Sequence, residues 1–506
     1  MQKKFLLAIL KNTCYITTVI ITDIIYLGRL LIKMNLRKFG LITLIASIGT
    51  AVFGASIDHI QNYTAEYNAN MAQQGAISAT TSVYYNPAGL MRLKNGTYFT
   101  GGVQLAIGEE TMKYDTKHDG NSHNYDADLF APIPNFALFK KNDDRAYFWT
   151  FGGIAGGGNL EYKDGVAGIT VLEDALNSTP FGTPLKPLEK GNIAFAQNAR
   201  DTGSWAEGEN MYAQTTLGMA WNVNSKLSLS AAGRLVYGWR NLKAHLDAEA
   251  DINIVNNKQV VANYKNQHIT ADIDSERTAW GFGGQFGLNY AYDDTWNFAM
   301  RYDTKIKMEF EADATSRKAN ILGQPTDLGF EMFFPQYADG TKFRRDLPAI
   351  LALGVSQKVT DRWTMFYGAN YYFNESAKID KDVVYTNIID QNEKITGMEY
   401  DNGWELSLGT EYWLNEKWAV LGGVNYAKTG AKAGSYSDVE FAIDSFLVGM
   451  GVKYRPDEDT EWVVSTSHYF YESTDGKFSE KYHGLANDQR YDKNISSIGF
   501  SYTKKF

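Results

Sequence analysis

Apolar and polar residues alternate with a period of two along most of the chain after residue 95. Trp296, Phe298 and Met300, for example, share one face of such a stretch, while Arg301 and Asp303 share the other. A period of two predicts β-strands, and a consistent difference between the faces predicts a sheet whose two faces meet different surroundings. The pattern therefore predicts a large all-β protein.

A short polar turn followed by Trp recurs along this pattern. The unit is a strand, a turn of Asn, Asp, Glu and Lys, and a second strand that usually opens with Trp; it spans residues 221–227, 290–296, 359–363, 412–418 and 454–462. In a soluble β-sandwich large aromatics fill the middle of the core. In an outer-membrane barrel they form girdles at the interfaces, beside short periplasmic turns. The position of the aromatics therefore favours a barrel.

Fourteen strands can be counted, and an even number is what single-chain bacterial barrels use. They are expected at 96–108, 132–140, 145–155, 208–223, 226–246, 266–292, 295–312, 346–359, 362–376, 402–413, 417–428, 443–455, 460–473 and 494–506. Closure removes the sheet edges, whose unpaired backbone groups cost several kcal/mol each in lipid. Residues 96–506 are thus predicted to form a transmembrane antiparallel β-barrel in the bacterial outer membrane.

Composition excludes several other classes. The chain is polar on average, with a mean hydropathy of −0.34, although it contains 32 Tyr, 27 Phe and 11 Trp. A helical membrane bundle would need repeated apolar runs of about 20 residues. The net charge of −9 speaks against a nucleic-acid partner, and the single Cys excludes a disulfide framework. The seven His show no metal-ligand spacing, so we expect no metal, no cofactor and no enzyme.

The N-terminus predicts export. Residues 34–55 combine a short basic region, an apolar core of about ten residues and a small-residue end, which are the parts of a secretory signal peptide. A membrane anchor is the alternative, but this core is too short to span a bilayer. Residues 1–33, which contain the sole Cys, Cys14, are expected to be an over-extended start, with Met34 the true start.

Residues 56–95 are too polar for a strand pair and too long for a simple tail. They are expected either to form a periplasmic extension or to fold into the barrel as a plug. Glycines that share the inward phase of the strands leave room for a second backbone. They are Gly281, Gly283, Gly287, Gly409, Gly423, Gly449, Gly451 and Gly499, and relief of sheet curvature is their alternative role.

The order of these parts resembles the FadL-type family of outer-membrane transporters for long-chain fatty acids, which includes TodX-like aromatic hydrocarbon channels. The resemblance rests on a signal, a segment of about 40 residues that ends in Asn86, Pro87 and Ala88, fourteen strands and a terminal Phe506. It implies that residues 56–95 are an N-terminal hatch with Asn86, Pro87 and Ala88 as its motif. It also implies that Phe506 is an assembly signal read by the barrel assembly machinery.

The third predicted strand contains three consecutive glycines, Gly156, Gly157 and Gly158, which weaken a strand and permit a kink. A phosphate loop is the other interpretation of such a run, but no Gly-Lys-Ser/Thr follows. In the family that the chain resembles, a kink in the third strand opens a side gap through which a hydrophobic ligand leaves. The resemblance therefore implies a lateral opening at these glycines.

Four cations are candidates for binding the carboxylate of a ligand, because strand parity places them inward: Arg234, Arg277, Arg301 and Lys305. Pairing with inward acids such as Asp303, Glu405 and Glu411 is the alternative role. The stretch 328–334 is apolar for an outer loop and is a candidate capture site.

The function expected from these features is passive uptake of a hydrophobic molecule, in the first place a long-chain fatty acid, by a monomer in the outer membrane. The steps would be binding in the lumen, rearrangement of the hatch and lateral release. A general diffusion porin and a surface adhesin built on a barrel are the alternatives.

Overall fold

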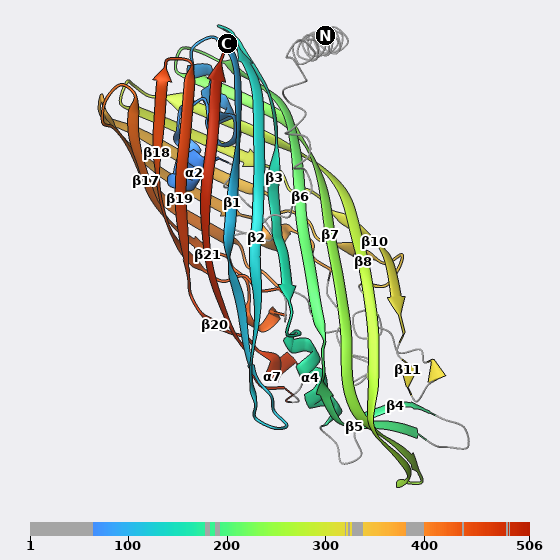
Figure 1. Ribbon diagram of the computed structural model, residues 1–506. Coiled ribbons are helices and arrows are strands. Elements are labelled where there is room, and N and C mark those ends of the chain that lie inside the picture. Colours follow the sequence, from blue (N-terminus) through green and yellow to red (C-terminus); the bar gives the residue numbers. More distant parts are fainter. Residues whose placement is uncertain are drawn as a thin grey trace, which may run out of the picture. The chain divides into compact units, whose positions relative to one another are not determined.

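Fourteen antiparallel strands form a closed barrel in the computed structural model (Figure 1). The described residues are 64–177, 183–187, 193–318, 320–321, 324–325, 337–380, 399–437, 440–481, 484 and 486–506. The expected over-extended start, the signal peptide and residues 56–63 of the expected hatch lie outside them, as does the apolar stretch 328–334.

The wall strands follow one another in chain order, and the last pairs with the first. They are β1 (Gly96–Asp115), β2 (Ser122–Lys141), β3 (Arg145–Tyr162), β6 (Trp205–Asn222), β7 (Leu227–Asn256), β8 (Gln259–Ala291), β9 (Trp296–Asp303), β14 (Ile350–Thr360), β15 (Trp363–Tyr372), β16 (Gly403–Trp413), β17 (Trp418–Lys428), β18 (Ser445–Asp457), β19 (Thr460–Tyr471) and β21 (Arg490–Lys505). Pairing of β1 with β21 from Tyr98↔Lys505 to Lys113↔Arg490 closes the barrel. The predicted fold class and the fourteen predicted strands are confirmed.

The two faces of the wall differ as the period of two predicts. On β9, Phe298, Met300 and Tyr302 are about 40% exposed on the outer face (41, 42 and 38%). The alternate residues Arg301 and Asp303 are buried inside. Trp363, Tyr412, Trp418 and Trp462 lie beside short turns and are also partly exposed on the outer face. This arrangement matches a lipid-facing band with an aromatic girdle at one end.

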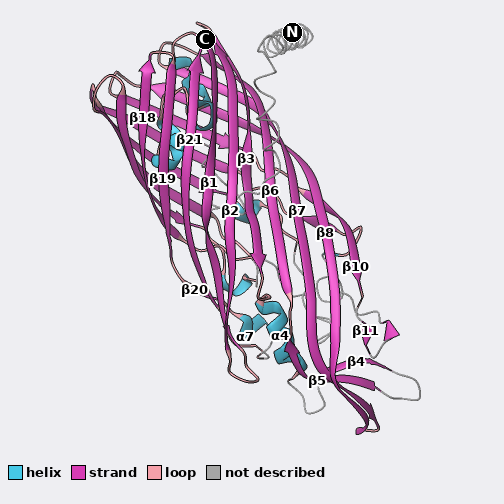
Figure 2. Cartoon of the chain, in the orientation of Figure 1, coloured by secondary structure: helices cyan, strands magenta, loops and turns pink. Residues whose placement is uncertain are grey.

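Short turns join the strands at one end of the barrel, near the C-terminus, and long connections join them at the other (Figure 2). The long connections carry the helices α4 (Ala167–Leu176) and α7 (Phe478–Lys481), the short helices η6 (Asn374–Ser376) and η7 (Ala433–Ser435), and the short strands β4 (Thr183–Pro187), β5 (Ile193–Asp201), β10 (Glu309–Arg317), β11 (Asn320–Ile321), β12 (Gln324–Pro325), β13 (Lys342–Arg344) and β20 (Thr474–Asp475). No helix among the described residues is both long and apolar enough to cross a membrane.

The β7–β8 hairpin is much longer than predicted. Its strands have 30 and 33 residues, roughly 100 Å at about 3.3 Å per residue, whereas β14–β17 have 10 or 11. Asn257 and Lys258 both adopt positive φ angles (49° and 64°) and close the hairpin with a two-residue turn. The predicted loop between 246 and 266 is therefore wrong, and this side of the barrel continues as sheet well beyond the other.

Candidate functional site

Residues 64–93, which we call the luminal segment, fill one end of the barrel interior (Figure 1). They form α2 (Ala65–Ala69), η2 (Gln73–Gly75), α3 (Ser82–Tyr85) and η3 (Pro87–Arg92), and nearly all of them are buried. Thr64 caps α2, since its hydroxyl oxygen accepts a hydrogen bond from the Tyr67 amide. Helices this short are marginal alone, so packing inside the barrel must hold them.

Glycines on the inner wall let the backbone of the luminal segment approach closely. A Cβ on Gly423 would stand 2.8 Å from Asn70 Cα, and one on Gly499 would stand 2.9 Å from Ala65 Cα. Gly409, Gly449 and Gly451 likewise face residues 68–70. Gly281 and Gly283 share the inward phase but face a different segment, residues 304–308.

Asn86, Pro87 and Ala88 connect the luminal segment to β7 and β8. The Asn86 side chain accepts a hydrogen bond from the Gly89 amide (3.2 Å) and donates one to Asn289 Oδ1 (2.7 Å). Pro87 occupies the first turn of η3, where no amide hydrogen is needed. The Ala88 carbonyl accepts from the Ser228 hydroxyl (2.7 Å). The motif thus joins a helix start to two wall strands.

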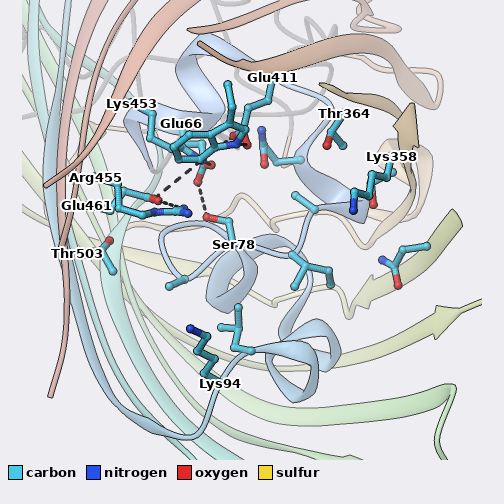
Figure 3. A pocket seen from close by; sticks show the side chains of 18 of the residues that line it. Glu66, Ser78, Lys94, Lys358, Thr364, Glu411, Lys453, Arg455, Glu461 and Thr503 are labelled. Atoms are coloured by element: carbon cyan, nitrogen blue, oxygen red, sulfur yellow. Dashed lines mark hydrogen bonds and ion pairs between the residues drawn. The ribbon is translucent and has the colours of Figure 1, made fainter. Parts of the chain in front are cut away.

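A buried ionic cluster attaches the luminal segment to the opposite wall (Figure 3). Lys453 of β18 pairs with Glu66 of α2 and with Glu411 of β16 (2.7 Å), and lies 3.9 Å from Glu461 of β19. Arg455 pairs with Glu461 at 2.6 Å. Burial raises the pKa of Glu66 above its ordinary value. Lys453 opposes this rise, whereas the carboxylates of Glu461 and Glu411 add to it.

This cluster lies at the inner end of a cavity of about 600 Å³ at the short-turn end of the barrel. Its charged lining residues are Glu66, Lys94, Asp293, Asp294, Lys358, Asp361, Glu411, Lys453, Arg455, Glu458, Asp459, Glu461 and Lys505. A cavity with so many charges is a poor environment for an apolar molecule, because desolvating those charges is costly.

Two of the four predicted cations, Arg234 and Arg301, line one small buried cavity of about 20 Å³. Arg234 donates to Gln214 Oε1 (2.9 Å), and no carboxylate of the described chain forms an ion pair with it. Arg301 donates to the Tyr84 carbonyl (2.9 Å) and lies 3.2 Å from Asp303. The expected alternative, pairing with an inward acid, therefore applies to Arg301.

The other two predicted cations lie elsewhere. Arg277 lies farther along the lumen, directly opposite Arg240 on β7, and stacks 4.3 Å from the Tyr337 ring centre. Lys305 is exposed and donates to the Ser376 carbonyl (2.9 Å), so its inward placement was wrong. The reason is that β9 ends at Asp303. On β9 the odd-numbered residues face inward, whereas from Ile306 onward the even-numbered residues do.

Arg240 and Arg345 have an ionic partner that sequence reasoning missed. Glu440, in the connection after η7, pairs with Arg240 and with Arg345 (3.0 Å). Burial alone would raise the pKa of Glu440, but the neighbouring arginines hold it at about 2. Arg240 shares the inward parity of Arg234 on β7, and that signal could have found it. Nothing in the sequence pattern indicates that a loop carboxylate reaches it.

Gly156, Gly157 and Gly158 lie where β3 leaves β2. Pairing of the two strands stops at Asn135↔Gly152 and resumes at Phe130↔Asn159, so residues 153–158 have no partner on β2 in the described ladder. Gly156 has a φ of +129°, which L side chains rarely adopt. Pro132 and Pro134 lie in the unpaired stretch of β2 and have no amide hydrogen to donate.

The outer end of the lumen holds a second set of buried acids. On α4, the carboxylate of Asp174 accepts hydrogen bonds from the Tyr114 hydroxyl and from the Lys117 and His118 amides. The shortest distance from each of the two amide nitrogens to Asp174 is 2.9 Å. Burial raises the pKa of the adjacent Glu173 to about 7. Among the described residues, no group of three or more His, Cys, Asp or Glu has the arrangement of a metal site.

Comparisons with known proteins agree with this geometry. Residues 195–506 match the family model described as outer membrane protein transport protein (OMPP1/FadL/TodX). Outer membrane protein P1 of Haemophilus influenzae is 27% identical over 161 residues, 31% of each chain. A long-chain fatty acid transport protein of Escherichia coli is 23% identical over 198 residues, 37% of this chain and 42% of that one. The match thus spans less than half the length of these curated relatives.

Solved structures share the fold. A Pseudomonas aeruginosa FadL homologue has a TM-score of 0.60 at 15% identity, over 90% of this chain and 100% of that one. The Pseudomonas putida toluene transporter TodX has a TM-score of 0.56 at 16% identity, over 89% of this chain and 100% of that one. Because the family model covers more than half of the chain, this outer-membrane β-barrel belongs to the OMPP1/FadL/TodX family of outer membrane transport proteins.

Proposed function

We propose that the protein lets hydrophobic molecules with an anionic head, most simply long-chain fatty acids, enter the outer membrane by passive diffusion. The cargo enters at the long-loop end, binds in the lumen and leaves sideways between β2 and β3. The luminal segment acts as a hatch that closes the short-turn end.

The observation that carries this proposal is the break between β2 and β3 beside the arginine cavity. Gly152 and Ile154 of β3 line that cavity together with Arg234 and Arg301. Phe130, at the end of the break on β2, is 56% exposed on the outer face. An apolar cargo that leaves here enters lipid directly, whereas the charged cavity at the short-turn end offers it no apolar path.

The charge of the cavity supports an anionic cargo, because Arg234, Arg301 and Asp303 line it and Asp303 offsets the charge of Arg301 only. Arg234 is 2% exposed and its described contacts include no carboxylate, so a carboxylate head would find a charge-assisted partner. The Escherichia coli relative is named for long-chain fatty acids and the Pseudomonas putida structure for toluene. Arg234 favours the acid over the neutral aromatic, because a carboxylate forms a charge-assisted hydrogen bond with a buried guanidinium, whereas toluene can form only a weaker cation–π contact.

Uptake by cells tests the proposal. A deletion strain and a complemented strain are compared for uptake of radiolabelled oleate and of radiolabelled toluene. We expect oleate uptake to fall several-fold on deletion and to return on complementation. Unchanged uptake of both compounds would overturn the proposal, and a loss confined to toluene would overturn the choice of cargo.

A general porin and an adhesin predict different results. In planar bilayers a porin conducts ions continuously, whereas a barrel filled by residues 64–93 conducts almost none. An adhesin leaves oleate uptake unchanged on deletion but reduces attachment of cells to surfaces.

We also propose that the protein acts as a monomer and that Phe506 is recognised during assembly. Phe506 is 66% exposed at the end of the barrel, and its amide donates to the Thr97 carbonyl (2.8 Å). Phe506→Ala should lower the amount of folded barrel in the outer membrane, measured by heat-dependent mobility on gels.

A further inference from the structure

The barrel wall has a second break, between β8 and the chain that follows β9. Pairing of β8 with β9 ends at Gln285↔Asp303. Two further hydrogen bonds join Thr304 to Gly284: the Thr304 amide donates to the Gly284 carbonyl, and the Gly284 amide donates to the Thr304 hydroxyl oxygen (2.8 Å). Pairing with β10 begins at Thr278↔Glu311. Residues 279–283 of β8 therefore have no described ladder partner on that side. Residues 304–310, which we call the inner flap, pass this gap.

From Lys305 to Phe310, the described backbone pairing of the inner flap lies on the other side only. Ile306 pairs with Leu347, the Arg345 amide donates to the Met308 carbonyl (3.0 Å), and the Met308 amide donates to Asp346 Oδ1 (3.1 Å). A segment held along one edge can move away from β8 without breaking the opposite ladder. The luminal segment, by contrast, is attached on several sides.

The inner flap turns apolar side chains into the lumen. Ile306, Met308 and Phe310 are 0% exposed, and the residues between them face outward. They lie over inward-facing glycines of β7 and β8. A Cβ on Gly238 would stand 2.8 Å from Phe310 Cζ, and one on Gly283 would stand 2.9 Å from Ile306 Cγ1.

The glycines thus form an apolar groove in the inner wall, and the flap occupies it. Even the Lys307 carbonyl oxygen would lie 2.9 Å from a Cβ on Gly281, so the backbone of the flap packs against this groove as well as its side chains. A side chain at any of these glycines would crowd the native flap side chains, so Gly283 can accept one only if Ile306 is shortened.

The flap adjoins the arginine cavity on its long-loop side. Gly283, which Ile306 covers, is the cross-strand partner of Arg234. Four residues farther toward the long loops, a continuous row of cross-strand partners is formed by Ala155, Tyr212, Gly238 and Ala279. Phe310 meets Tyr212 of this row edge-on, with 5.8 Å between ring centres. The row joins the β3 break to the flap.

The arginine cavity is too small for a cargo in this structure. Its volume of about 20 Å³ is room for about one water molecule. An alkyl chain or an aromatic ring must therefore displace protein atoms on its way to Arg234. Val83 and Tyr84 of the luminal segment line the cavity together with wall residues, and the flap lies next to it, where Ile306 covers Gly283. The apolar side chains of the flap are therefore the ones a cargo meets beside the cavity, on the long-loop side.

We propose that the inner flap is the gate and the size filter for apolar cargo: it occupies the glycine groove when the site is empty, and the apolar part of the cargo takes its place. This inference rests on the proposed uptake function. It assigns Ile306, Met308 and Phe310 as the residues whose bulk determines which cargo passes.

A reversible lock tests the gate. Gly283→Cys is combined with Ile306→Cys in a chain whose Cys14 is replaced by Ser, and the purified protein is placed in liposomes. With the disulfide formed, as verified by mass spectrometry, oleate uptake should fall at least tenfold, and a reductant should restore it. In each single cysteine variant, the same oxidant should leave that variant's own rate of oleate uptake unchanged, because no second thiol is within reach.

The outcomes separate the two proposals. Full uptake through the oxidised, cross-linked protein would overturn the gate and leave the uptake function intact. Absence of uptake by the wild-type protein and by the reduced variant would overturn the uptake function itself.

A second variant keeps the gate testable if the cysteine pair does not fold. Met308→Ala shortens a flap side chain, and Met300→Ala, on the outer face of β9, is its matched control. Uptake of a fatty acid with a bulky pyrene end, relative to oleate, should rise several-fold in Met308→Ala and stay unchanged in Met300→Ala. An equal ratio in the two variants would overturn the assignment of the filter.

Discussion

Replacing Lys453 with methionine should loosen the luminal segment. The ammonium group is shared by Glu66, Glu411 and Glu461, whose side chains are 2, 14 and 9% exposed, and the Lys453 side chain itself is 3% exposed. Methionine has a similar length but no charge, so the variant leaves buried carboxylates with less compensation. Removing one partner of a buried ion pair costs about 3–5 kcal/mol.

Glu66 belongs to the luminal segment, whereas Glu411 and Glu461 belong to the wall. The Glu66 carboxylate can regain water only if α2 leaves the wall, so much of this cost should appear as easier opening of the segment. At about 1.4 kcal/mol per tenfold, the open population should rise on the order of 10²- to 10³-fold.

A buried thiol reports this opening. Ser82 is 0% exposed and is linked to Glu66 through Ser78, whose amide donates to the Ser82 hydroxyl oxygen (2.8 Å) and whose hydroxyl donates to Glu66 (2.7 Å). In a Ser82→Cys background lacking Cys14, the rate of maleimide labelling is measured with and without Lys453→Met. The added Glu66→Gln change should recover part of the lost protection, because it removes one uncompensated charge.

Lys94→Met is the matched control, since Lys94 and its partner Glu458 are 73 and 84% exposed. An exposed pair contributes little, so labelling should stay close to the parent rate. If Lys453→Met labelled no faster than Lys94→Met while the barrel kept its heat-dependent gel mobility, the ionic cluster would not hold the luminal segment.

Three further predictions concern the cargo path and the outer end. Pro132→Ala combined with Pro134→Ala returns two amide donors to β2, so the gap between β2 and β3 should close and oleate uptake should fall several-fold. Ile133→Val is the control, and unchanged uptake in the double variant would argue against lateral exit. Arg234→Gln should lower oleate uptake about tenfold and leave toluene uptake unchanged, because it removes a charge-assisted hydrogen bond worth about 1.5–3 kcal/mol. The control is Arg277→Gln, since Arg277 lies outside the cavity. Glu173 has a folded pKa of about 7, above its ordinary 4.5, so docking of α4 should weaken as pH rises from about 4.5 to about 7. Glu173→Gln should therefore stabilise the outer end by about 3 kcal/mol above pH 7 and not at pH 4, as measured by hydrogen exchange of α4; equal protection at both pH values would contradict this account.

The strand ends beside the short turns were predictable within one or two residues. The predicted strand 417–428 is β17 at Trp418–Lys428, and 402–413 is β16 at Gly403–Trp413. Here an apolar outer face, an aromatic girdle and a polar turn follow one another within a few residues. The contrast is strong because lipid demands apolar side chains at alternate positions.

The opposite ends were harder to predict. The first hairpin, β1 and β2, and the β7–β8 hairpin continue past the apolar band into water, where both faces of a strand can be polar. Alternation then fades although the backbone ladder continues. Thus β7 runs to Asn256 rather than 246, and β2 begins at Ser122 rather than 132.

Among the candidate site residues, parity along a strand was enough to place Arg234, Arg277 and Arg301 inward. It could not place Lys305, because one extra residue after Asp303 inverts every later side chain. It also could not bring Glu66 to Lys453 and Glu461, because Glu66 and Lys453 are 387 residues apart in the sequence.

The sequence alone thus determined the fold class, the fourteen strands and the inward phase of the wall, because each depends on local alternation against lipid and water. Only the tertiary structure decided which inward residues meet, where the wall is broken and which segment fills each gap. Those contacts depend on closure of the barrel and on its register, which bring distant strands and the luminal segment within reach of one another.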